Sequence, residues 1–214
     1  MEFSNLVNMA NAAVKSNKIQ EAIKLFDNAL KLNPTSFEVC SKLGLLSFQA
    51  GDLDNSINYF KKTLLLDPKS SLGYSNLGLI YSKLNNQDLA LENYLKAYEI
   101  DPKNFIVNYN LANHFFSNND DKSAEKYYQL SIELNPRHFY PYNNLFQLYD
   151  RSNNLEKLEK IFSNIIKLFG RGPEVQFLEG TLEFKKKNYK KTIEIFKSLE
   201  FDKSNYQKSV LITN

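Results

Sequence analysis

The chain has 214 residues, of which 43% are hydrophobic and 24% are charged, the balance of a folded protein and not of a disordered one. Its mean hydropathy is −0.45, and it contains no run of about 18 apolar residues, so a membrane-spanning helix is excluded. Its first residues lack the basic and apolar regions of a secretory signal. The net charge of +3 is too small to indicate nucleic-acid binding. We therefore expect a soluble, cytoplasmic protein that binds neither membranes nor nucleic acid.

The residue types that usually carry chemistry are scarce. One cysteine, Cys40, cannot form an internal disulfide, and with only two histidines no zinc site made of protein ligands is expected. His114 precedes the core residue Phe115, so it is interpreted as a partly buried packing residue and not as a general base. His138 lies in a linker and is expected to be solvated, whereas Cys40 is expected to be an inert core thiol. We predict no metal, no cofactor and no catalytic residue in this segment.

A 34-residue period organises the sequence. Prolines recur at this spacing, and one unit shows a complete pattern, Tyr-x2-Leu-Gly-x2-Tyr followed by Ala-x3-Tyr, Ala and Pro. The recurring prolines are Pro34, Pro68, Pro102 and Pro136, and the complete unit has Tyr74, Leu77, Gly78, Tyr81, Ala90, Tyr94, Ala97 and Pro102. This pattern resembles the tetratricopeptide repeat, a family of paired helices.

The resemblance implies an all-α, right-handed superhelical solenoid of six helix-turn-helix repeats. The repeats fill a domain of residues 3–206, as units 3–36, 37–70, 71–104, 105–138, 139–172 and 173–206. Small residues at positions 8 and 20 let the two helices of a unit approach closely, and bulky residues at positions 7 and 24 fill the space between units. The turn between the helices falls at position 15, where residues that tolerate a left-handed backbone recur. These turn residues are Asn17, Gly51, Asn85, Asn119 and Asn153.

The last two units depart from this pattern. Phe146 and Leu158 stand where small residues are expected, and Glu179 and Glu183 stand where a leucine and an aromatic residue are expected. Two registers remain open for the sixth unit. Either the two glutamates face the interior, or a shift by one residue moves Gly180 and brings in three apolar side chains instead: Val175, Leu178 and Leu182.

Residues 207–214 form a tail or the start of a truncated seventh repeat, and no polar capping face is evident there. Three alternatives follow: the tail folds back, the protein self-associates through an uncapped end, or the chain is the front part of a longer protein. We expect the last. Repeats resembling these precede glycosyltransferase and sulfotransferase domains, so the alternative function is an N-terminal substrate-recruiting module of an enzyme whose catalytic domain follows Asn214.

The resemblance also implies a concave groove, lined by the first helix of each pair, that binds an extended peptide of a partner protein. Four of the six residues at position 6 are asparagine, which resembles the asparagine ladder of the O-linked N-acetylglucosamine transferase superhelix: Asn8, Asn76, Asn110 and Asn144. An amide offers a donor and an acceptor together, so it can pair with a peptide backbone. The alternative is that these are solvated residues in a chain that holds 27 asparagines.

Position 13 carries a line of basic residues: Lys15, Lys83, Arg151 and Lys185. Tyr109 is a candidate apolar anchor in the groove. The basic line either binds acidic or phosphorylated partners or is a solvated face. A carboxylate clamp for chaperone C-termini is not expected, because position 5 holds no lysine. RNA binding is not expected either, because the period is 34 residues and the groove lacks a dense basic lining. The sequence therefore predicts a protein-interaction scaffold.

Overall fold

A computed structural model describes residues 2–199 of the chain, and within that range it contains twelve α-helices and no β-strand. The predicted all-α helical-repeat fold is confirmed. The chain divides into two compact units, the first ending at Leu134 and the second beginning at Asn135. Within residues 2–199, no helix has the length and apolar character needed to cross a membrane.

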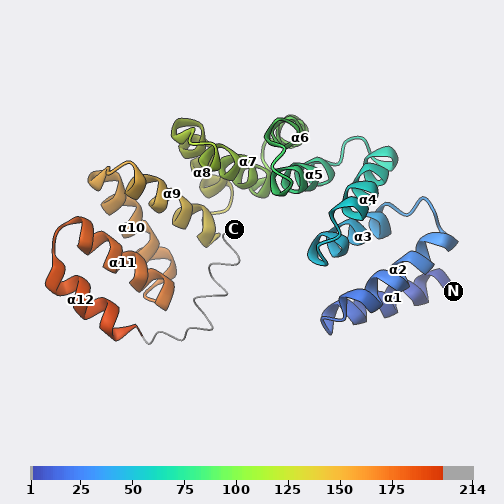
Figure 1. Ribbon diagram of the computed structural model, residues 1–214, viewed down its shortest axis with the longest axis horizontal. Helices are drawn as coiled ribbons and strands as arrows, with labels where there is room; N and C mark the ends of the chain where they lie inside the picture. The colour runs from blue at the N-terminus through green and yellow to red at the C-terminus, as the bar shows by residue number, and fades with distance from the viewer. Residues whose placement is uncertain (1, 200–214) are drawn as a thin grey trace. The chain divides into compact units, whose positions relative to one another are not determined.

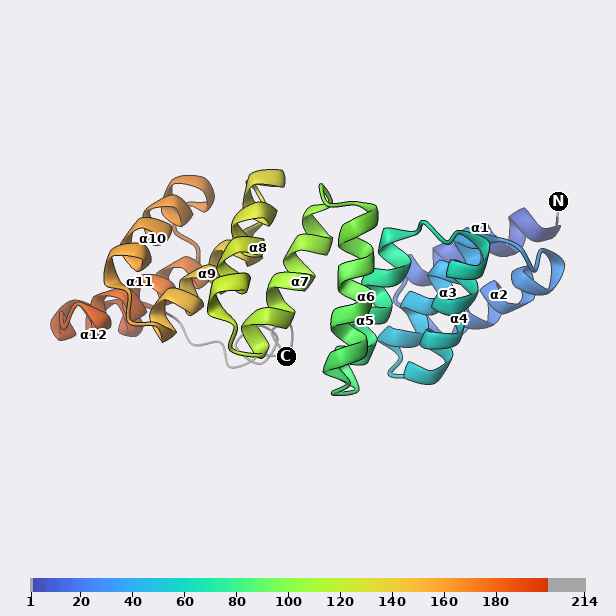
Figure 2. The same cartoon turned by 90° about the horizontal axis from the view of Figure 1, so that it is seen from above.

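The first unit consists of four antiparallel helix pairs that follow one another in chain order (Figures 1 and 2). Its helices are α1 (Glu2–Lys15), α2 (Ile19–Leu32), α3 (Phe37–Gln49), α4 (Leu53–Leu66), α5 (Ser71–Lys83), α6 (Gln87–Ile100), α7 (Phe105–Ser117) and α8 (Asp121–Leu134). The second unit consists of two pairs. Its helices are α9 (Phe139–Arg151), α10 (Leu155–Phe169), α11 (Pro173–Lys185) and α12 (Tyr189–Ser198).

The turn inside each pair has the predicted left-handed backbone. Position 15 has a positive φ in all six pairs, with Asn in four of them, Gly in one and Lys in the last. The values are 56° for Asn17, 81° for Gly51, 59° for Asn85, 60° for Asn119, 51° for Asn153 and 61° for Lys187. Asn and Gly adopt this conformation at low cost, so in five of the six pairs the sequence itself ends the first helix just before this residue.

Side-chain caps then start most of the second helices. The Asp52 carboxylate accepts a hydrogen bond from the backbone N–H of Asn55 at 3.1 Å, and the Asn86 side chain accepts one from Leu89 at 3.2 Å. Such a cap satisfies a backbone donor that has no partner inside the helix. The end of one helix and the start of the next are therefore encoded within three residues.

Close approach within the pairs of the first unit depends on a small residue facing a large one. A Cβ atom on Gly78 would lie 2.6 Å from Cδ1 of Tyr94, so only glycine fits there. At position 20, Ala90 is fully buried, and the fully buried Ser56 donates from its hydroxyl to the Gly44 carbonyl at 2.7 Å. These contacts confirm the predicted roles of positions 8 and 20 in the first unit.

The two helix pairs of the second unit pack in different ways. In α9–α10, Phe146 and Leu158 are both buried, and the two helices approach each other less closely than the other pairs do. In α11–α12 the glycine returns, and a Cβ on Gly180 would lie 2.5 Å from Cε1 of Phe196. The larger residues of the fifth unit therefore act as spacers between its helices.

Helix α11 has the features of both registers that the sequence left open for the sixth unit. Gly180 keeps its repeat position against Phe196, and Lys187 occupies the turn position. Five further side chains of α11 are nevertheless buried together, the two glutamates and the three apolar residues alike: Val175, Leu178, Glu179, Leu182 and Glu183. No shift of the helix is needed. Residues 200–206 of the predicted sixth unit and the predicted tail, 207–214, lie outside the described residues.

Candidate peptide-binding face

The first helices of the first unit carry three of the four residues of the predicted ladder. Here α5 contacts both α3 and α7. We call the surface formed by positions 2, 6, 9 and 13 of α1, α3, α5 and α7 the first-helix face. On α5 these positions hold Leu72, Asn76, Leu79 and Lys83. Residues three or four apart lie on one side of a helix, so the four side chains form one stripe.

The structure places two ladder residues on adjacent helices. Asn76 on α5 and Asn110 on α7 are both half-buried, and the Asn110 amide donates to Oγ of Ser75 at 3.0 Å. Asn8 is exposed on α1. Asn144 lies on α9, in the second unit, where it is half-buried and accepts a hydrogen bond from the Asn143 amide at 3.3 Å. Of the predicted ladder residues, the structure therefore places Asn76 and Asn110 on helices in direct contact.

Lysine interrupts the ladder on α3. The Lys42 ammonium donates to Oδ1 of Asn11 at 2.8 Å and pairs with the Glu38 carboxylate at 2.7 Å. Asn76 differs, because within residues 2–199 its amide has no hydrogen-bond partner. One amide of the first-helix face therefore keeps a donor and an acceptor for another molecule.

The basic residues predicted at position 13 differ in whether they form ion pairs within the protein. In the first unit, Lys83 is exposed, and its Nζ lies 4.9 Å from the ring centroid of Phe48. In the second unit, Lys185 pairs with the Asp150 carboxylate at 3.1 Å and donates to Oδ1 of Asn153 at 2.8 Å. Arg151 is exposed on α9. Lys83 thus keeps a positive charge on the first-helix face, whereas that of Lys185 is neutralised locally.

Tyr109 is half-buried and belongs to a group of aromatic rings, so it does not stand out from the face as a separate anchor. Its ring centroid lies 6.2 Å from that of Tyr128, and the Phe116 ring lies 6.3 Å from the same tyrosine. The Tyr128 hydroxyl donates to Oδ1 of Asn113 at 2.7 Å. Tyr109 therefore supports the face from one side and presents only part of its ring.

The remaining candidates are packing residues. His114 is buried, its ring lies 5.8 Å from that of Tyr94, and burial lowers its pKa, as the predicted packing role requires. Cys40 is fully buried, and burial raises the pKa of its thiol. The prediction for His138 was wrong. This residue is half-buried, with its ring 5.6 Å from that of Tyr140, and burial lowers its pKa.

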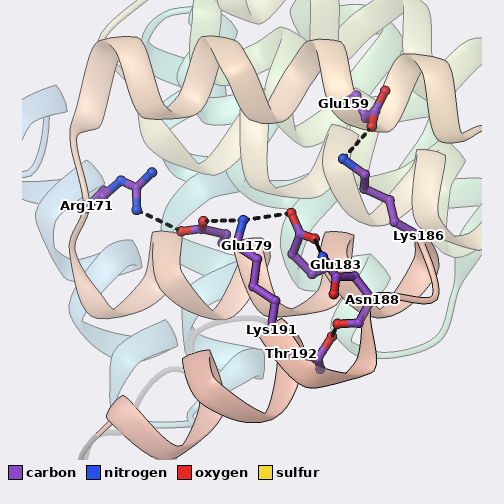
Figure 3. Close-up of polar contacts among 8 residues, drawn as sticks. All are labelled: Glu159, Arg171, Glu179, Glu183, Lys186, Asn188, Lys191 and Thr192. Carbon is purple, nitrogen blue, oxygen red and sulfur yellow. Dashed lines mark hydrogen bonds and ion pairs between the residues drawn. The ribbon is translucent and has the colours of Figure 1, made fainter.

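A charged cluster in the second unit explains how the glutamates of α11 are tolerated (Figure 3). The ammonium of Lys191, on α12, lies between the two carboxylates, 3.5 Å from Glu179 and 3.0 Å from Glu183. Arg171 adds a contact of 3.4 Å to Glu179, and the Asn188 amide donates to Glu183 at 3.0 Å. Each buried carboxylate is thus paired, as buried charges must be.

The same contacts set the protonation of Glu183. Burial acts to raise its pKa, but the hydrogen bond and charge of Lys191, the Asn188 amide and the charge of Lys186 outweigh it, so the pKa lies below the ordinary value. Lys186 itself forms a separate ion pair with Glu159 of α10, at 3.0 Å. This cluster was not predicted from the sequence, although a lysine on the helix that follows two interior glutamates was an available signal.

Comparisons with known proteins agree with this architecture. Family models described as tetratricopeptide repeat match residues 7–71, 71–104 and 106–138, together more than half of the chain. A search of curated proteins found none that matches. Within residues 2–199, no three His, Cys, Asp or Glu side chains gather as a metal site would require.

Several solved structures share the fold. PilW, described as a widely conserved type IV pilus biogenesis factor, is 16% identical over 94% of this chain and 93% of its own, with a TM-score of 0.81. PilF of Pseudomonas aeruginosa is 14% identical over 98% of this chain and 97% of its own, with a TM-score of 0.78. YrrB, described as a TPR protein with an unusual peptide-binding site, is 19% identical over 79% of this chain and 88% of its own, with a TM-score of 0.59. At these identities the likeness concerns the fold alone.

Proposed function

This chain belongs to the tetratricopeptide repeat family, and on that premise we propose that it is a protein-interaction scaffold that binds an extended peptide segment of a partner protein on its first helices. The observation that carries the proposal is the pair Asn76 and Asn110, half-buried at the same repeat position of the adjacent helices α5 and α7. Amides at this spacing can pair with the C=O and N–H groups of an extended chain, whose backbone groups have no internal partners.

The other predicted residues have graded roles in this proposal. Asn8 extends the amide row along the first unit, and Lys83 supplies a charge beside it. Tyr109 provides a partly covered aromatic surface. On the second unit, Asn144 and Arg151 offer the same kinds of groups, an amide and a cation. We also propose that the described segment acts by binding and without catalysis, in the cytoplasm.

A pull-down from native lysate tests the proposal. The wild type is compared with the triple variant Asn76→Ala, Asn110→Ala, Asn144→Ala, after circular dichroism has shown equal helicity. A matched control replaces three exposed asparagines on second helices, Asn28→Ala, Asn58→Ala and Asn164→Ala. We expect the ladder variant to lose a set of proteins that the wild type and the control both retain. Recovery of the same proteins by all three would overturn the proposal.

A further inference from the structure

Four exposed apolar side chains lie on the first-helix face in a particular order. Two occupy position 9 on α3 and α5, and two occupy position 2 on α5 and α7. They are Leu45, Leu79, Leu72 and Ile106, with exposed fractions of 50%, 37%, 49% and 41%. We call these four residues the apolar track. The corresponding positions on the outer helices are polar, with Ser4 and Asn11 on α1, Glu38 on α3 and Asn113 on α7.

The order of these residues makes the track diagonal. It begins near the end of α3 at Leu45, crosses α5 from Leu79 to Leu72, and reaches the start of α7 at Ile106. Because α5 contacts both α3 and α7, the track crosses three helices that lie side by side. Single exposed leucines are normal on a protein surface, but a run across three adjacent helices is typical of a binding surface.

The asparagine in the middle of the apolar track indicates the conformation of the segment that binds there. Asn76 lies between Leu72 and Leu79 on α5, with an amide that is without a partner in the described part of the chain. A helical occupant would offer that amide no backbone group, because its N–H and C=O groups are already bonded internally. An extended occupant offers both, and it directs alternate side chains towards the track.

The length of the occupant follows from helix packing. Axes of packed helices lie about 8–10 Å apart, so three helices span roughly 20 Å between the outer axes. An extended chain rises about 3.3 Å per residue, so about six or seven residues cross the track. Three or four of their side chains would face it, which agrees with the four apolar positions available.

The charge of Lys83 indicates which type of residue lies at one end of the bound peptide. Lys83 lies four residues beyond Leu79 on α5, and its Nζ is held 4.9 Å from the Phe48 ring of α3, so it marks the α3 end of the track. Lys42, the other lysine of the first-helix face on these three helices, is already paired with Glu38. Within residues 2–199, Lys83 has no carboxylate partner, and an acidic side chain at that end of the peptide would supply one.

We infer that the first unit binds an extended segment of about seven residues that carries apolar side chains at alternate positions and an acidic residue at the end over Lys83 and Phe48. The inference rests on the proposed function and adds the chemistry of the partner. It depends on α3, α5 and α7 alone, and therefore on the first unit.

A random seven-residue peptide library displayed on phage is the probe. Selected on the wild-type protein, it should enrich peptides with alternating apolar residues and an Asp or Glu at one end. The variant Lys83→Glu should exchange that terminal preference for Lys or Arg, whereas the control Lys61→Glu, on an exposed part of α4, should leave it unchanged. The double variant Leu72→Glu, Leu79→Glu should lower phage recovery about tenfold or more. Its control is Leu65→Glu, Leu95→Glu on second helices, at sites that are also exposed.

Several results would overturn the inference. One is enrichment of peptides with helical spacing of apolar residues, and another is a terminal preference that Lys83→Glu does not alter. Failure to enrich any peptide would also overturn it, as would a dimer of the wild type that Leu72→Glu, Leu79→Glu converts to a monomer. The proposed function is judged separately by the lysate experiment, since loss of partners from the asparagine variant would stand even if the peptide chemistry were wrong.

Discussion

The pair α5–α6 of the first unit and the pair α11–α12 of the second share one contact and differ in what surrounds it. Both place a glycine against an aromatic ring, Gly78 on Tyr94 and Gly180 on Phe196. Beside the glycine, α5 carries the buried Leu77, and α11 carries the buried Glu179 at the equivalent position. The approach of two helices is therefore set by the glycine contact, while the residues around it can be apolar or ionic.

The difference has an energetic consequence. Burying a leucine side chain contributes about 1.5–3 kcal/mol to folding, whereas a buried ion pair contributes little in net terms, because desolvation offsets the attraction between the charges. The charged cluster around Lys191 satisfies its carboxylates but adds less stability than an apolar interior would. We expect the last pair of helices to be the weaker one and to depend on charge.

The largest expected effect comes from closing the glycine contact in the first unit. Gly78→Leu places a side chain where even a Cβ would lie 2.6 Å from Tyr94, so the two helices must separate. We expect a loss of about 3 kcal/mol in the free energy of unfolding, measured by urea denaturation followed by circular dichroism. The control Asn58→Leu adds the same side chain at an exposed site on α4. Equal stability of the two variants would contradict the proposed packing.

A smaller effect is expected from the charged cluster. Lys191→Met removes the cation shared by Glu179 and Glu183 and leaves Glu183 with the Asn188 amide. Since the Lys191 side chain is 46% exposed, water replaces part of the lost contact, and we expect a loss of about 1–2 kcal/mol. The measurement is hydrogen exchange, with the faster exchange confined to α11 and α12. Uniformly faster exchange across both units would argue against a local role.

The pH dependence of the free energy of unfolding provides a control for Lys191→Met. Because the pKa of Glu183 lies below its ordinary value in the folded state, its contribution is present above the unfolded value of about 4.3 and is lost as the pH falls through the folded pKa. Lys191→Met should reduce the amount by which the free energy of unfolding falls at low pH. A combined variant, Glu179→Leu, Glu183→Tyr, Lys191→Met, replaces the ions with apolar residues and should recover the stability.

The sequence predicted those features that a single residue decides. Asn85 ends a helix and Gly78 admits a ring whatever lies elsewhere, so a 34-residue period was sufficient to place the helix pairs. Contacts between elements were not predictable in this way. The hydrogen bond from Asn110 to Ser75 and the pairing of Glu179 with Arg171 depend on which side chains the fold brings together.

The smallest expected effect compares the turns of the same two pairs. Lys187 has a φ of 61° and Asn85 one of 59°, but lysine pays a steric cost in the left-handed region that asparagine largely avoids. Lys187→Gly removes that cost and increases the entropy of the unfolded chain, so we expect a net gain of about 0.5 kcal/mol, seen as a higher melting temperature. Asn85→Gly should not raise the melting temperature. If both glycine variants changed the melting temperature equally, the turn of the last pair would be no more strained than the others, and its weakness would lie in the charged cluster alone.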